Sequence, residues 1–107
     1  MNKVKPITPE EACKVKKENI PDAVFTAFNT LIAKNFDSKY SAAVVKQKDV
    51  VSEIVKNSDI TSEEIFNNGY LDIEGIYRKA GWSVKYDKPG YNESYEPFFE
   101  FKKVNQR

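Results

Sequence analysis

The apolar residues of this 107-residue chain change their spacing at Gly81. Before Gly81 they recur every three or four positions, which is typical of helices that bury one face. After it, Trp82, Val84 and Tyr86 alternate with polar residues, as in a strand with one buried face. This change predicts an α+β fold, in which a helical N-terminal two-thirds packs on a small antiparallel C-terminal hairpin.

Start and stop signals divide the part before Gly81 into five predicted helices. Thr8 and Thr61 each begin a capping box, in which a threonine and the glutamate three residues later bond to each other's backbone N–H. Asp72 is expected to cap the last of the five. The widest apolar stripe lies on the second helix and predicts the main core contact. The five expected helices cover 9–18, 21–36, 48–57, 62–68 and 72–80.

Two segments outside these helices follow weaker patterns. Residues 41–46 fit either a short strand or the lead-in to a helix, because a segment this short cannot reveal a periodicity. Pro89-Gly90 suits the central positions of a type II turn. This turn would begin the connection from the strand after Gly81 to a second strand, whose pattern resumes from Tyr95.

Composition bears on the number of domains and on the cellular location of the protein. Hydrophobic residues make up 40% of the chain, enough for one core, so we expect a single domain over 1–107 with frayed ends at 1–7 and 104–107. No apolar run is long enough to span a bilayer, and no apolar region follows the basic N-terminus as in a secretion signal. One cysteine cannot form an internal disulfide, which favours a cytoplasmic location without membrane contact.

The residue types present argue against most catalytic and metal chemistry. The chain contains no histidine, the usual general base and metal ligand, and no phosphate-binding loop or serine-nucleophile motif. The carboxylates of Asp87, Glu93 and Glu96 are typical of a solvated loop. Cys13 lies among lysines and is expected to be a small apolar contact. We therefore expect a non-enzymatic protein without cofactor or metal.

The loop of the predicted hairpin carries more aromatic side chains than a hairpin core needs. Tyrosine is frequent in protein interfaces because it offers a large area with few rotatable bonds. Phe98 points away from the face that holds Phe99 and Phe101, so it either meets a helix or adds to this loop surface. A second copy of the chain is one candidate for the partner. The predicted protein-contact residues are Tyr91, Asn92, Glu93, Tyr95 and Phe98.

The predicted order of elements also matches a winged helix, a variant of the helix-turn-helix that binds nucleic acid or protein. In that alternative, the helix at 72–80 is the recognition helix and residues 88–92 form the wing. The acidic residues Asp72 and Glu74 at the start of this helix argue against its approach to the phosphates of a nucleic acid. The residues that would face a nucleic acid are Arg78, Lys79, Lys85, Lys88, Lys102 and Lys103.

Two motifs lie around the predicted hairpin: Tyr77-Arg78-Lys79-Ala80-Gly81-Trp82 and, over 86–93, the core Tyr-Asp-x-Pro-Gly-Tyr-Asn-Glu. With them, the chain resembles small uncharacterised proteins of tailed bacteriophages over roughly 60–103, and the core over 86–93 is the specific part of the similarity. The resemblance attaches no activity and no catalytic residues. It implies a phage-encoded protein in the host bacterial cytoplasm or in a phage particle, and it favours a role in binding host machinery.

Overall fold

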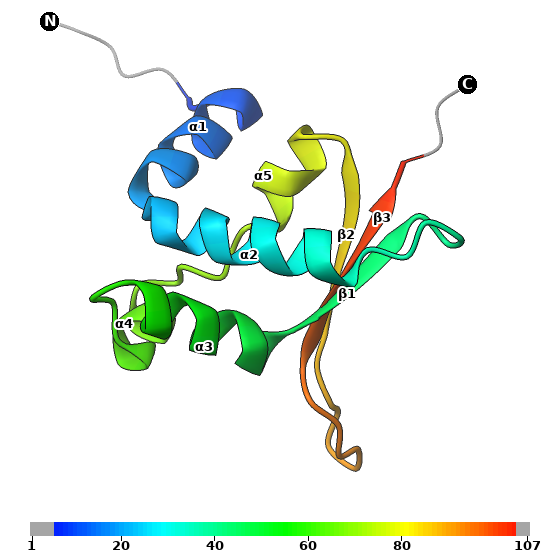
Figure 1. Ribbon diagram of the computed structural model, residues 1–107. Helices are drawn as coiled ribbons and strands as arrows, with labels where there is room; N and C mark the ends of the chain where they lie inside the picture. The colour runs from blue at the N-terminus through cyan, green and yellow to red at the C-terminus, as the bar shows by residue number, and fades with distance from the viewer. Residues whose placement is uncertain (1–5, 105–107) are drawn as a thin grey trace, which may run out of the picture.

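The computed structural model describes residues 6–104 and shows five helices on one side of a three-stranded sheet (Figure 1). This arrangement confirms the α+β prediction. Most of the ends that were expected to be frayed, at 1–7 and 104–107, lie outside the described residues. In chain order the elements are α1 Pro9–Asn19, α2 Asp22–Asn35, β1 Ala42–Lys46, α3 Gln47–Asn57, α4 Ser62–Asn67, α5 Glu74–Lys79, β2 Trp82–Asp87 and β3 Phe98–Lys103.

The sheet is antiparallel and has the strand order β1-β3-β2. Residues 41–46, left open by the sequence, therefore contribute a strand, which pairs with β3 from Ala42↔Lys102 to Lys46↔Phe98. The predicted hairpin of β2 and β3 is present, with Val84 opposite Phe101. The strand that comes last in the chain thus lies at the centre of the sheet.

The helices cover only one face of this sheet. Alternation along β3 directs Phe99 and Phe101 toward the helices, where they are 2% and 0% exposed. Phe98, Glu100 and Lys102 alternate with them and therefore belong to the opposite face, which no helix covers in Figure 1. We call this uncovered side the outer sheet face. It is built from Ala42, Val44, Lys46, Ser83, Lys85, Asp87, Phe98, Glu100 and Lys102.

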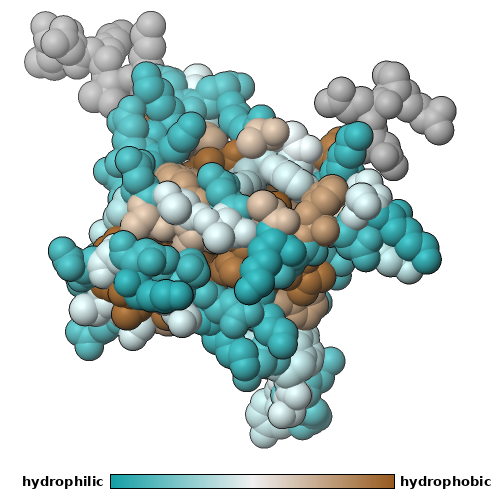
Figure 2. Space-filling view, viewed as in Figure 1, coloured by the Kyte–Doolittle hydropathy of each residue, from teal (hydrophilic) through white to brown (hydrophobic). Residues whose placement is uncertain are grey.

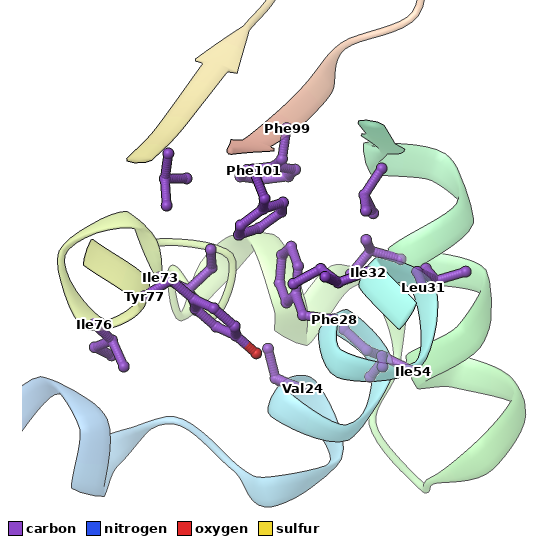
Figure 3. Packing of buried hydrophobic residues seen from close by; sticks show 14 of the residues in the cluster. Val24, Phe28, Leu31, Ile32, Ile54, Ile73, Ile76, Tyr77, Phe99 and Phe101 are labelled. Carbon is purple, nitrogen blue, oxygen red and sulfur yellow. The ribbon is translucent and has the colours of Figure 1, made fainter. Parts of the chain in front are cut away.

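The centre of the core is an aromatic cluster around Phe28 of α2. The Phe28 side chain is fully buried and meets Phe99 edge-on, with 5.1 Å between the ring centroids. The rings of Phe101 and Tyr77 lie 6.1 and 6.0 Å from Phe28 (Figure 3). Edge-to-face rings at these distances attract one another beyond the effect of burial. The apolar stripe predicted on the second helix therefore forms the core contact, as expected from its spacing.

The two predicted capping boxes are confirmed, but the predicted cap of α5 is wrong. Thr8 and Thr61 each accept the backbone N–H of the glutamate three residues later at 3.1 Å. Residue Ile73, not Asp72, precedes α5, and no side chain caps that helix. The Asp72 carboxylate instead accepts a hydrogen bond from Lys16 of α1. A long-range ion pair has therefore replaced the local cap that the sequence suggested.

The expected type II turn at Pro89-Gly90 is also wrong. Such a turn needs a positive φ at its third residue, and among the described glycines only Gly69 and Gly81 have one. The chain reverses slightly later, where the Glu93 N–H donates to the Gly90 carbonyl at 3.2 Å. The second strand likewise begins at Phe98 rather than near Tyr95.

One side chain bonds to each outer edge strand of the sheet. On β1, the Asn35 amide donates to the Val44 carbonyl at 2.9 Å, and the backbone of Asp37 forms a bridge with that of Ala42. On β2, the Arg78 guanidinium donates to the Val84 carbonyl at 2.8 Å. Unpaired strand edges invite other strands to add to a sheet, and occupied edge groups oppose this. The occupied carbonyls of Val44 and Val84 therefore oppose the pairing of a fourth strand at these two positions.

Candidate contact site at the hairpin arm and outer sheet face

The connection between β2 and β3 projects from the body of the molecule, at the bottom of Figure 1. We call residues 88–97 the hairpin arm. Residues 91–96 are all exposed, and the side chain of Tyr91 is fully exposed. In Figure 2 the surface of this projection is of intermediate to hydrophilic character (white to teal), whereas apolar patches (brown) lie over the body. The arm therefore presents polar and aromatic side chains and buries little of its own surface.

Tyr95 ties the arm back to the end of β2. Its hydroxyl lies 2.5 Å from an Asp87 carboxylate oxygen and 2.8 Å from the Lys88 carbonyl, and can donate its proton to either. The hydrogen bond to Asp87, with smaller effects from burial and from the charges of Asp87 and Glu93, raises the pKa of Tyr95 to about 12. The Tyr95 phenol therefore keeps its proton to a higher pH than an ordinary tyrosine and is available as a donor in this contact.

A second set of bonds shapes the tip of the arm. A carboxylate oxygen of Glu93 accepts the Gly90 backbone N–H at 2.8 Å, while the Glu93 N–H donates to the Gly90 carbonyl. A Cβ on Gly90 would come within 2.9 Å of that carboxylate oxygen, so glycine suits this close approach. Glu93, predicted as a contact residue, thus bonds within the arm itself.

Phe98 lies on the outer sheet face, so the alternative in which a helix covers it is wrong. The register places it between Lys46 of β1 and Asp87 of β2. Its ring is half-buried, and the ring of Tyr95 packs beside it with 6.2 Å between centroids. Phe98 and Tyr95 therefore form a joint aromatic surface at the base of the arm.

A shallow hollow of about 540 Å³ adjoins this aromatic pair. Phe98, Tyr95 and Val44 contribute apolar side chains to its lining, and the other lining residues are charged. A hollow of this size can accept a large side chain of a partner, and charged lining residues can contribute to the choice of partner. The residues that line it are Val44, Lys46, Asp87, Tyr95, Glu96 and Phe98.

The five predicted contact residues therefore divide between two places. Tyr91 and Asn92 lie in the exposed stretch of the arm, whereas Tyr95 and Phe98 lie at its base against the sheet. Sequence reasoning missed Val44 and Lys46, which reach the same hollow from β1. The only signal for them was the apolar run at 42–45, and it could not be used without the pairing of β1 with β3.

The basic residues of the nucleic-acid alternative are distributed over several surfaces. Lys85 and Lys102 belong to the outer sheet face, where Lys102 lies 3.9 Å from Glu100. Lys79 lines a hollow beside α1, and Lys103 lines another hollow beside Trp82. Arg78 donates to the edge of β2, and Lys88 belongs to the arm. This distribution does not form the continuous basic stripe that is typical of a duplex binder.

The bond between Arg78 and Val84 leads to a stability prediction. Arg78→Ala should lower the free energy of unfolding by about 1 kcal/mol, because the Val84 carbonyl loses a charged donor. It should also increase self-association, since the edge of β2 loses its cap. Urea unfolding and size-exclusion chromatography at several protein concentrations would measure both effects. The neighbouring Lys79→Ala is the matched control and should change stability by no more than about 0.5 kcal/mol; equal losses would remove the proposed role of Arg78.

Within residues 6–104, no three side chains of the kinds that hold metal ions gather in one place. No helix in that range is both long enough and apolar enough to cross a membrane.

Comparison with known protein families, curated proteins and solved structures finds no match to this chain.

Proposed function

We propose that this protein is a small non-enzymatic binding module, which contacts a protein partner through the hairpin arm and the adjoining outer sheet face. The observation that carries the proposal is the fully exposed Tyr91 on an arm held by its own hydrogen bonds. A tyrosine presented on an ordered arm loses less conformational entropy on binding than one on a flexible loop.

The hollow at the base of the arm supports the same proposal. Apolar and charged side chains line it together, and protein interfaces combine an apolar centre with a polar border. The sheet edges are capped by Asn35 and Arg78, so addition of a partner strand is the less favoured way to bind. We therefore expect side-chain contacts across the outer sheet face rather than a shared sheet.

The resemblance to tailed-bacteriophage proteins supplies a biological context for this proposal. Under it, the protein is phage-encoded, acts in the cytoplasm of the host bacterium, and binds a component of the host machinery. A second copy of this chain and a phage particle are alternative partners for the same surface. The proposal does not include an enzymatic activity, and two polar groups of the arm, the Tyr95 hydroxyl and the Glu93 carboxylate, bond to neighbouring groups of the hairpin.

One observation favours the nucleic-acid alternative. An arm projects between the second and third strands of the sheet, where a winged helix carries its wing. Two features oppose it. The basic residues lie on several surfaces, and Arg78 of the short helix α5 donates to the sheet edge. We therefore rank protein contact first and use duplex binding as the opposing outcome of the test.

The test places a photo-crosslinking phenylalanine analogue at position 91 of the full chain. We expect one discrete crosslinked protein from bacterial lysate, and loss of that partner's binding, by at least tenfold, in Tyr91→Ala when it is titrated in purified form. Tyr91→Ala should change the free energy of unfolding by no more than about 0.5 kcal/mol, since Tyr91 is fully exposed.

Position 40 provides the matched control, because Tyr40 is also well exposed, at 68%, but lies outside the arm. The analogue at position 40 should give no crosslink to the same protein, and Tyr40→Ala should leave the affinity unchanged. Equal crosslinking from both positions would refute a specific role for the arm. Binding to a random DNA duplex that weakens steeply with added salt would instead support the winged-helix alternative.

A further inference from the structure

A basic hollow of about 360 Å³ lies between α1 and α5. In Figure 1 these two helices stand at the opposite end of the molecule from the hairpin arm. The hollow is therefore separate from the proposed contact site. The lining residues that matter for its chemistry are Glu10, Cys13, Lys14, Lys17, Ile76 and Lys79.

The sequence of α1 explains why charged side chains turn toward α5. Positions 10, 13, 14 and 17 are three or four residues apart and so share one face of a helix. On α1 this face carries a carboxylate, a thiol and two ammonium groups, and it lines the hollow. Lys79, the last residue of α5, adds a third ammonium group from the other side.

The charges around this hollow are not balanced. Three lysines line it, at Lys14, Lys17 and Lys79, against the single carboxylate of Glu10. Within residues 6–104, none of these three lysines lies within 4 Å of a carboxylate, whereas Lys16 of the same helix pairs with Asp72. Like charges gathered at one place repel, and a bound anion with several oxygens would relieve that repulsion.

The packing of α1 gives a second reason to expect a ligand here. Among the described residues, α1 is the helix that buries no side chain, and its Val15 is 48% exposed. An isolated helix of 11 residues is only marginally stable in water. Cys13, half-buried against the core as predicted, and the Lys16–Asp72 pair are its attachments to the body. A ligand bound by both helices would add a further connection.

We propose that this hollow binds a small phosphate-bearing ligand, whose oxygens accept hydrogen bonds from Lys14, Lys17 and Lys79. Phosphate groups suit the site because they present several strong acceptors and more than one negative charge to three point-like cations. The hollow has room for one or two phosphate groups, and the other lysines discussed above lie on different surfaces. A small ligand therefore fits better than the backbone of a duplex.

The experiment titrates inorganic pyrophosphate into the ¹⁵N-labelled full chain and follows the amide signals by NMR. We expect saturable shifts confined to α1 and α5, with the hairpin arm unaffected. Each of Lys14→Gln, Lys17→Gln and Lys79→Gln should weaken binding by roughly fivefold, because each removes one exposed charged contact. Glu10→Gln should strengthen binding, since among the described residues Glu10 is the only carboxylate that lines the hollow.

Two controls separate this site from general attraction to anions. Lys56→Gln, at the exposed end of α3, removes the same charge elsewhere and should leave the affinity unchanged. Pyrophosphate should also slow alkylation of Cys13 by iodoacetamide to a limiting rate, because the bound ligand covers the hollow that the thiol lines.

Three results would overturn the proposal. Shifts that spread over the whole surface without saturating would show an unspecific attraction of anions to lysines. An equal loss of affinity in Lys56→Gln and Lys14→Gln would place the binding elsewhere. A short DNA duplex that binds more tightly than pyrophosphate, and loses that affinity in the same three lysine variants, would assign the hollow to a nucleic-acid backbone.

Discussion

Phe28→Ala should lower the free energy of unfolding by about 3–5 kcal/mol, which is a large part of the stability of a domain of this size. Phe28 is fully buried and lies against Phe99, Phe101 and Tyr77, so its removal leaves a cavity bounded by both layers of the fold. The loss would appear as a lower urea midpoint in unfolding followed by tryptophan fluorescence and circular dichroism.

Phe66→Ala is the matched control for this prediction. Phe66 belongs to the short helix α4 and is 54% exposed, so the same substitution should lower stability by no more than about 1 kcal/mol. Similar losses in the two variants would mean that α2 does not hold the centre of the core. A Phe28→Ala protein that remained as stable as the unmodified chain would contradict the packing shown in Figure 3.

The second large effect is a loss of stability at alkaline pH through Tyr77. Burial raises the pKa of Tyr77 from 10.0 to about 12. Above pH 10 the unfolded chain releases the phenolic proton while the folded chain keeps it, so the unfolded state binds fewer protons and stability falls. Between pH 10 and pH 12 this one group should lower the free energy of unfolding by about 2 kcal/mol.

Tyr77→Phe separates this effect from the titration of other groups. At pH 7 the variant should be less stable by about 1 kcal/mol, because it loses the hydrogen bond of 2.6 Å that the Tyr77 hydroxyl donates to Asn29. At pH 12 the order should reverse, with the variant the more stable protein. Urea unfolding at a series of pH values would locate the crossing. Tyr40→Phe, at an exposed site, should give a curve parallel to the unmodified chain, and the absence of a crossing would disprove the assignment.

Much of the fold could be predicted from local pattern, because helices and hairpins are decided within a few residues. The stripe on α2 and the capping boxes at Thr8 and Thr61 specify their helices without help from the rest of the chain. The alternation at Trp82, Val84 and Tyr86 similarly specifies β2. In each case a period or a bond over three or four positions carries the information.

Features that depend on distant partners could not be predicted in this way. The strand at 42–46 forms because its residues pair with β3, more than fifty positions later. The Asp72 carboxylate does not cap α5 and bonds instead to Lys16, which is equally remote in sequence. The bond of Arg78 to the Val84 carbonyl spans only six positions, but it depends on how α5 packs beside β2, which no local pattern indicates.

The candidate site shows the same division between local and distant information. The exposure of Tyr91 follows from its position in a polar loop, and the sequence indicated it. The role of Tyr95 depends on its approach to Asp87, and the hollow beside Phe98 depends on Val44 and Lys46 from another strand. Local pattern therefore located the arm, while the shape of the surface at its base required the pairing of all three strands.

The central position of β3 has a consequence for the kinetics of folding. Since β3 pairs with both β1 and β2, neither earlier strand has its sheet partner until the last strand has been synthesised and placed. The pairing of β1 with β3 also closes a long loop, which slows folding because the entropy of closure is lost before the contacts form. We therefore expect helices to form early and the aromatic cluster to stay accessible to solvent and chaperones until β3 docks.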